Sequence, residues 1–240
     1  EHTHKGTADL PAQDFIGILR REGVAVLKGI QPLGMLLQSF VGGDIRSGEN
    51  GLAQCFHLRF QAGRKYRQTH YLNEADIFFF DAAEAGLRYL ASELRKKGTL
   101  VYFEPESDAD QKKFLKAVEV SDIVKFSHEK VTDLSFVTRY TNKLFIRTLG
   151  AEGLEFNLCE QGWVKINSLQ NNNVVDTEGA GDWTTSQFIA DICEKDILSI
   201  SQMTVENLTP CLTHACKTAS HSVSYLGSKG MIVDGMYVHV

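Results

Sequence analysis

The chain has 240 residues, of which 43% are hydrophobic and 23% are charged, and its formal net charge is -5. This composition excludes intrinsic disorder, a collagen-like repeat and a coiled coil as descriptions of the whole chain. The mild negative charge, without a basic block, argues against nucleic acid or an anionic membrane surface as the main partner.

The first 70 residues give few structural predictions. A helix is expected over residues 13–22, with Gly23 as its stop. Short apolar runs separated by glycine follow, and some of them are expected to be strands. These runs cover residues 24–27, 35–41 and 52–60.

From about residue 75, short apolar runs alternate with amphipathic stretches. Strands are expected at residues 77–80, 100–103, 122–126 and 143–149. Helices are expected at residues 82–97 and 108–119, the second capped by Ser107 or Asp108. This alternation predicts an α/β domain in which helical crossovers join parallel strands.

The rest of the chain continues the same domain. A hairpin is expected where residues 154–158 and 163–166 flank a short polar turn. Helices are then expected at residues 182–195 and 205–225. No internal repeat or low-complexity linker divides the chain, so residues 1–240 are predicted to form one domain.

Residues 176–182, with the sequence DTEGAGD, carry the strongest chemical signal. Glycines at this point let backbone N–H groups turn toward one spot, and a helix starting near Asp182 adds unpaired N–H groups of its own. Such a place suits a phosphate or a developing anion, and an ionised Asp182 beside it suits a general base. The alternative for an isolated motif of this kind is a glycine-rich turn whose Asp caps a helix.

The wider pattern favours the chemical interpretation. Residues 176–182 resemble the C-terminal signature of the ribokinase-like (PfkB) family of sugar and nucleoside kinases. Four more segments resemble motifs of that family in the same order, so that the resemblance covers about residues 75–235. These are residues 103–105 (FEP, with Glu104 in place of Asp), 122–131 (the N-x-x-E segment), 148–153 (T-x-G-x-x-G) and 227–230 (GSKG).

The resemblance implies a Rossmann-like three-layer α/β/α fold with a mostly parallel central sheet. It also implies a kinase that uses ATP and Mg²⁺ to phosphorylate a hydroxyl of a sugar or related polyol. A monovalent cation and a homodimer are left open as further features. No Walker A loop occurs in the sequence.

Roles for individual residues follow from the same resemblance. Asp182 is expected to be the catalytic base. The anion hole is expected to be built by Gly179, Ala180 and Gly181. The nucleotide site is expected to be lined by Thr148, Gly150, Gly153, Gly227 and Gly230. The vicinity of the phosphates or a cation is expected to include Asp176, Thr177, Ser127 and Glu129.

Three departures from the family pattern stand out. Ser127 and Lys130 occupy the Asn and Glu positions of the N-x-x-E motif, and Glu129 could replace that Glu by a shift of one residue. Trp183 follows the expected base, where a small residue is commoner; it either narrows the site or packs into the core. Residues 1–70 lack a clear sugar-binding signature, so this acceptor-binding part is expected to be incomplete or divergent beside a core at residues 75–235.

Two functions remain open at this stage. The first is the sugar kinase, and the second is a nucleotide-binding module that has the same fold without catalysis. No apolar run reaches the roughly 18 residues that cross a bilayer. The five cysteines form no CxxC pair, so a cytoplasmic chain with reduced thiols is expected.

Overall fold

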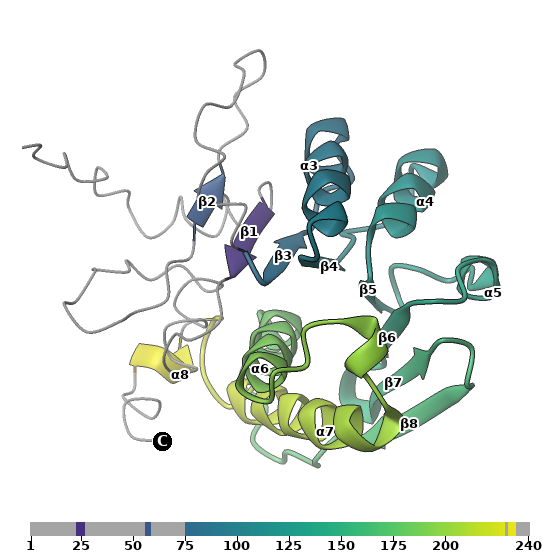
Figure 1. Cartoon of the computed structure of the whole chain (residues 1–240). Coiled ribbons are helices and arrows are strands. Elements are labelled where there is room, and N and C mark those ends of the chain that lie inside the picture. The colour runs from purple at the N-terminus through teal and green to yellow at the C-terminus, as the bar shows by residue number, and fades with distance from the viewer. Residues whose placement is uncertain (1–22, 27–55, 59–74, 229, 234–240) are drawn as a thin grey trace, which may run out of the picture.

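The computed structural model of the chain describes residues 23–26, 56–58, 75–228 and 230–233 (Figure 1). The described strands form one sheet in the order β2-β1-β3-β4-β5-β6-β7-β8. Their bounds are β1 Gly23–Val26, β2 Phe56–Leu58, β3 Ile77–Phe80, β4 Leu100–Phe103, β5 Ile123–Ser127, β6 Leu144–Thr148, β7 Gly153–Leu158 and β8 Trp163–Asn167. The helices are α3 Ala85–Lys96, α4 Gln111–Val120, α5 Ser135–Arg139, α6 Ala180–Glu194, α7 Val205–Ser222 and α8 Gly230–Val233, with 3₁₀ turns η2 Gly150–Glu152 and η3 Ile200–Gln202.

Helices cover both faces of the sheet. Figure 1 shows α3, α4 and α5 on one side of the strands and α6 and α7 on the other. Strands β3 and β4 are apolar along their whole length because both of their faces are buried. In β3, Ile77 and Phe79 join the core under α6 and α7, whereas Phe78 and Phe80 join the core under α3 and α4. The predicted three-layer α/β/α fold is therefore confirmed.

The parallel part of the sheet lies at its centre. Strands β3, β4, β5 and β6 run parallel to one another. Antiparallel strands flank them, with β1 and β2 on one side and the β7–β8 hairpin on the other. The four central strands therefore end at the same edge of the sheet, and the segments that follow them are brought together there.

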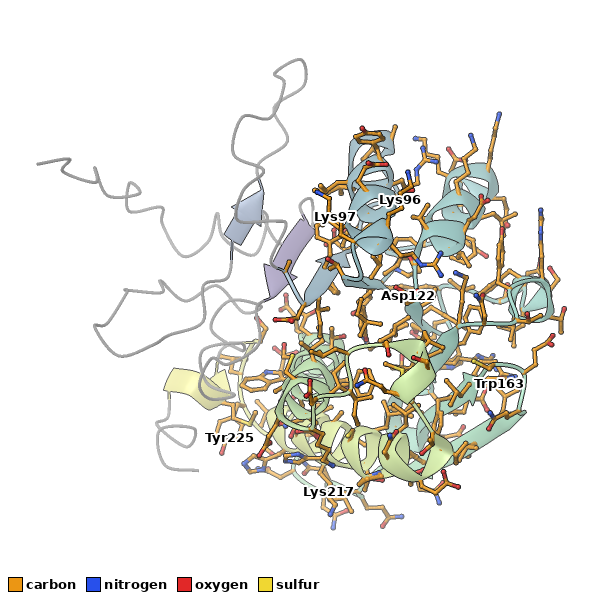
Figure 2. The ribbon with its side chains drawn as sticks, viewed as in Figure 1. Lys96, Lys97, Asp122, Trp163, Lys217 and Tyr225 are labelled. Carbon is orange, nitrogen blue, oxygen red and sulfur yellow. The ribbon has the colours of Figure 1, made fainter. Side chains whose placement is uncertain are left out.

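Charged side chains at the opposite edge hold the layers together. Asp122 precedes β5 and accepts hydrogen bonds from Arg95 Nε at 2.7 Å and from the Val101 amide at 2.9 Å. Figure 2 shows Asp122 in the interior, below α3 and α4, whereas Lys96 and Lys97 lie at the end of α3. The ammonium of Lys143 is buried and donates to the carbonyls of Glu119 and Ser121. Asp122 and Lys143 thus have hydrogen-bond partners, and their role is to stabilise the packing of the strands and helices.

Most predicted elements appear where the sequence places them. The strands at 77–80 and 100–103 match end to end, and the 154–166 hairpin is present as β7 and β8. Parts of the apolar runs 24–27 and 52–60 form β1 and β2. The expected helix at 13–22 and the run 35–41 lie outside the described residues.

Several predicted boundaries were wrong. Helix α6 begins at Ala180, two residues before the predicted start, so Asp182 lies inside its first turn. The cap of α4 is Asp110, which accepts from the Lys113 amide, and neither Ser107 nor Asp108 takes that place. Helix α7 ends at Ser222, before the predicted Tyr225. Helix α5 was not predicted, since five residues are too few for a helical period to show.

In the part of the chain that the structure describes, no helix is both long enough and apolar enough to cross a membrane.

Gly153, at the start of β7, lies in close contact with the backbone of β8. Its φ is +101°, and a Cβ there would lie 2.2 Å from the carbonyl oxygen of Ile166 on β8. We expect Gly153→Ala to lower the free energy of unfolding by at least about 2 kcal/mol, because backbone strain and a clash with rigid backbone add together. Chemical denaturation monitored by circular dichroism measures this loss.

Gly98→Ala is the matched control. Gly98 has a similar φ of +96°, but no atom lies within 4 Å of the position its Cβ would take. This variant should therefore lose only the strain contribution of about 1–2 kcal/mol. Equal losses in the two variants would contradict the close contact between β7 and β8.

Candidate functional site

The signature segment leads directly into α6. Gly179 is the residue before the helix and has a left-handed backbone, with φ at +81°. A Cβ at this position would lie 2.4 Å from the Cβ of Ser228, so both the conformation and the close approach require glycine. Ala180 and Gly181 open the helix, and Asp182 follows as the acidic residue of the first turn. A carboxylate there is stabilised by the positive end of the helix dipole.

The first turn of α6 leaves few amides for an anion. The Ala180 amide donates to the carbonyl of Thr177 at 3.3 Å and so closes the turn. The Trp183 amide donates to the carbonyl of Gly179 at 2.9 Å. Gly181 is exposed to solvent, which leaves its backbone accessible to a ligand. This opening at a helix N-terminus has the character of an anion site.

A buried ionic network ties this turn to the sheet. Lys125 on β5 pairs with Glu104, which directly follows β4, and also donates to the Gly181 carbonyl at 3.1 Å. The second oxygen of Glu104 accepts from the Thr185 hydroxyl at 2.6 Å. The start of α6 is therefore fixed against the carboxyl ends of β4 and β5.

Carboxyl groups gather at this edge of the sheet. Asp81 directly follows β3, and its Oδ1 atom is buried without a hydrogen-bond partner among the described residues. Burial, together with the nearby negative charges of Glu106, Glu104 and Asp182, raises the pKa of Asp81 to about 8. A neutral carboxyl in this position can donate a hydrogen bond, whereas an ionised one can only accept.

The T-x-G-x-x-G segment lies at the ends of neighbouring strands. Thr148 ends β6 and stands opposite Ser127 at the end of β5. Gly150 opens the 3₁₀ turn η2 with φ at +59°, and no atom lies within 4 Å of its Cβ position. Gly153 is buried against β8. Thr148 and Gly150 therefore border the same edge as the network, while Gly153 shapes the hairpin below it.

The glycine-rich segment after α7 contacts the signature segment through three interactions. Asp176 accepts from the Gly227 amide at 2.9 Å. The indole N–H of Trp183 donates to the Ser228 carbonyl at 3.0 Å, and Ser228 packs against Gly179. Gly230 begins α8. Of the predicted nucleotide residues, Gly227 is thus brought next to the signature segment, whereas Gly230 packs against Tyr225.

Asp176 and Thr177 precede this contact. Asp176 also accepts from the Glu178 amide at 3.0 Å, and these backbone donors lower the pKa of its carboxyl. Thr177 is exposed. Asp176 therefore acts as a fixed anion that shapes the loop.

Ser127, Glu129 and Lys130 form the turn after β5. The Glu129 amide donates to the Ser127 hydroxyl, and both Glu129 and Lys130 are exposed. Within the described part of the chain, no three His, Cys, Asp or Glu side chains are grouped to hold a metal ion. Mg²⁺ is commonly bound by one or two carboxylates together with substrate phosphates, and Glu129 is the exposed carboxylate of this turn.

Sequence reasoning did not single out Asp81, Lys125 or Thr185 as site residues. Lys125 has a signal in the sequence, since it is a lone charge inside an apolar strand. Asp81 also has one, because it directly follows an apolar strand at the end where parallel strands place ligands. Thr185 has none, since its role depends on the contact with Glu104.

Asp81 makes stability depend on pH in a defined direction. In the folded protein the pKa of Asp81 is about 8, above the ordinary value of 3.8. The contribution of the protonated carboxyl to the free energy of unfolding is therefore fully present below about pH 4 and is lost as pH rises to about 8. Asp81→Asn removes this dependence. We expect the variant to match the wild type near pH 4 and to exceed its stability by about 1–3 kcal/mol at pH 8, measured by denaturation across this range.

Asp133→Asn gives the control of opposite sign. Hydrogen bonds from Ser135 lower the pKa of Asp133, so any stability lost in this variant should shrink as pH falls. A stability gain in Asp81→Asn that did not change between pH 4 and pH 8 would contradict a raised pKa for Asp81.

The Trp183 indole should hold the segment around Ser228 in place. Trp183→Phe keeps an aromatic ring in the core but removes the N–H donor to the Ser228 carbonyl. We expect amide hydrogen exchange over residues 223–228 to become at least about tenfold faster. Trp163→Phe, a change to the half-buried tryptophan of β8, is the control, and unchanged exchange in Trp183→Phe would contradict the tether.

Comparison with known proteins agrees with the architecture. The chain is similar to ribokinase from Giardia lamblia (TM-score 0.58, 17% identity, covering 67% of this chain and 56% of that one). It is similar to fructokinase with bound ATP from Xylella fastidiosa (TM-score 0.56, 16% identity, covering 75% of this chain and 67% of that one). It is also similar to a nucleoside kinase from Burkholderia thailandensis in complex with inosine (TM-score 0.52, 14% identity, covering 66% of this chain and 53% of that one). At these identities the likeness shows the fold.

The extent of the match is also informative. The chain spans 56% of the length of the Giardia ribokinase. No curated protein matches the chain. Residues 59–233, well over half of the chain, match the pattern described as pfkB family carbohydrate kinase. The chain therefore belongs to the pfkB family of carbohydrate kinases.

Proposed function

We propose that this chain is an ATP-dependent kinase that transfers the γ-phosphoryl group to a hydroxyl of a sugar or related polyol. The observation that carries the proposal is the position of Asp182. It lies in the first turn of α6, beside the exposed Gly181, in a turn that is fixed to the carboxyl ends of β4 and β5. Membership of the pfkB family supports the same reaction class.

Asp182 would act as the general base. Phosphoryl transfer needs in-line positioning and charge stabilisation more than covalent help from the protein. An ionised Asp182 can accept the proton of the acceptor hydroxyl as that oxygen attacks phosphorus. Asp182 lies in the first turn of α6, where the positive end of the helix dipole favours negative charge.

Backbone groups around Gly179, Ala180 and Gly181 would face the transferred phosphoryl group. Their glycine-rich geometry allows close approach, and the dipole of α6 stabilises the charge that develops on the phosphoryl oxygens. Thr148 and Gly150 at the end of β6, with Gly227 and Gly230 after α7, would border the nucleotide. Gly153 would contribute by shaping the hairpin beside it.

Ser127, Glu129, Asp176 and Thr177 would lie near the phosphates. Mg²⁺ bound there would neutralise phosphate charge, with Glu129 as the nearest exposed carboxylate of the β5 turn. Lys130 adds a positive charge at the position where the family pattern has Glu. A monovalent cation and a homodimer remain predictions from the resemblance, and a cytoplasmic location remains a prediction from the cysteine pattern.

The neutral form of Asp81 would help to bind the acceptor. Its carboxyl lies close enough to Asp182 and Glu104 for their charges to raise its pKa. A protonated carboxyl at this place can donate to an acceptor oxygen while Asp182 accepts from another. This division of donor and acceptor fits a polyol, whose hydroxyls do both.

A nucleotide-binding module without catalysis is the second candidate. Lys130 favours it, because a cation in the N-x-x-E segment opposes Mg²⁺. An intact Asp182 argues for catalysis.

The deciding experiment is ADP release from Mg-ATP in the presence of a panel of sugars and nucleosides. We expect turnover with at least one acceptor, and Asp182→Asn should lower kcat by about 10²-fold or more while nucleotide affinity changes less than about threefold. Coupled spectrophotometry measures turnover, and calorimetry measures nucleotide binding.

Glu194→Gln is the matched control, because it neutralises an exposed carboxylate at the far end of the same helix. It should keep wild-type kcat. Full activity in Asp182→Asn would rule out its role as base. Nucleotide binding without turnover on any acceptor would favour the non-catalytic module.

A further inference from the structure

Lys125 is a buried cation whose place in the sheet needs an explanation. Its side chain is 3% exposed on β5, between apolar neighbours. Burying an ammonium group is costly unless it is paired and its protons are used in hydrogen bonds. Lys125 meets this condition with two acceptors, the Glu104 carboxylate and the Gly181 carbonyl.

Both acceptors connect Lys125 to helix α6, one directly and the other through a hydrogen bond from Thr185. The carbonyl of Gly181 belongs to the first turn of α6, and Glu104 accepts from Thr185, one turn further along. Residues four apart lie on one face of a helix. Lys125 and Glu104 therefore hold that face of α6 at two successive turns.

The first of these contacts acts on the peptide group that precedes the expected base. The Gly181 carbonyl and the Asp182 amide belong to one planar unit. When Lys125 holds the Gly181 carbonyl oxygen, it fixes the plane of this peptide group. The orientation of the Asp182 backbone relative to the sheet is fixed with it. A Cβ on Gly181 would lie 3.6 Å from Lys125 Nζ, so the ammonium lies directly against this turn.

Glu104 is itself anchored. Its amide donates to the Phe80 carbonyl at the end of β3. The contact surface for α6 is thus built from the ends of three parallel strands, β3, β4 and β5. Movement of α6 along or around its axis would break the contacts to Gly181 and Thr185 together.

We propose that Lys125, with Glu104 and Thr185, is a positioning element that sets the orientation of the Gly181–Asp182 peptide for phosphoryl transfer. This inference rests on the proposed kinase function. The three residues act through α6, and they are positioning residues. Displacement of a reacting group by about 1 Å can cost about 10²-fold in rate, so loss of the element should lower kcat more than it changes KM.

The test uses a paired substitution. Lys125→Met alone leaves the half-buried Glu104 charge without its ionic partner and is expected to destabilise the fold. Glu104→Gln together with Lys125→Met removes both charges, and the Gln oxygen can still accept from Thr185. This double variant should melt near the wild-type temperature, yet the Gly181 carbonyl has lost its donor.

We expect the double variant to lose about 10-fold to 100-fold in kcat, with KM for ATP and for the acceptor changed less than about threefold. Hydrogen exchange over residues 179–185 should be at least about tenfold faster. Lys113→Met, a change to an exposed lysine on α4, is the control for loss of a lysine. Wild-type kcat in the double variant would overturn the proposal.

A second variant covers the case in which the double variant does not fold. Thr185→Val removes one hydroxyl with little change in shape, and Thr209→Val on α7, whose hydroxyl donates to the Val205 carbonyl, is its control. Thr185→Val should lower kcat severalfold and Thr209→Val should not. Equal kcat in the two would overturn the proposal.

Hydrogen exchange separates this inference from the proposed function. If the wild type turned over no acceptor, the kinase proposal would fail, but exchange over residues 179–185 would still report how firmly the turn is held. Faster exchange in the double variant would then support the positioning element, and unchanged exchange would overturn it.

Discussion

The contact between Lys125 and the Gly181 carbonyl is the constraint on which the arrangement of the site depends. A parallel sheet brings the ends of β3, β4 and β5 to one edge, but this alone does not fix how a helix begins there. Glycines at 179 and 181 make the start of α6 conformationally free. The buried ammonium and the Glu104–Thr185 bond remove that freedom. The same glycines that permit close approach of an anion therefore need a side-chain tether from the sheet.

The two edges of the sheet treat charge in different ways. At one edge, Asp122 is paired with Arg95, and Lys143 donates to two carbonyls. At the other, Asp81 has a buried oxygen without a partner in the described part of the chain and a pKa of about 8. Burial without a partner lowers stability, and such groups are typical of sites that act on ligands. Part of the electrostatic cost of the fold therefore lies at Asp81, close to the start of α6.

The sequence was sufficient to predict the layers but not the contacts between them. The strands at 77–80 and 100–103 were predicted to the residue because their apolar runs end sharply. The start of α6 was predicted two residues late, since Gly181 has low helix propensity and the tertiary tether compensates for it. The cap of α4 was misplaced because Ser107, Asp108 and Asp110 are all good caps. Thr185 was missed because its partner is 81 positions away in the chain.

Trp183 shows how a departure from a family pattern can be absorbed by the fold. Of the two interpretations of this large residue, the structure supports core packing, since its side chain is 1% exposed among the apolar residues under α6 and α7. Its N–H still reaches Ser228, so the ring also joins the segment after α7 to the residue next to Asp182. The first turn of α6 is consequently held from two sides, by Lys125 from the sheet and by the Ser228 carbonyl of the glycine-rich segment, which accepts from Trp183. Asp182 therefore lies between two anchored residues, Gly181 and Trp183, so that these contacts supply the order that the glycines of the turn do not.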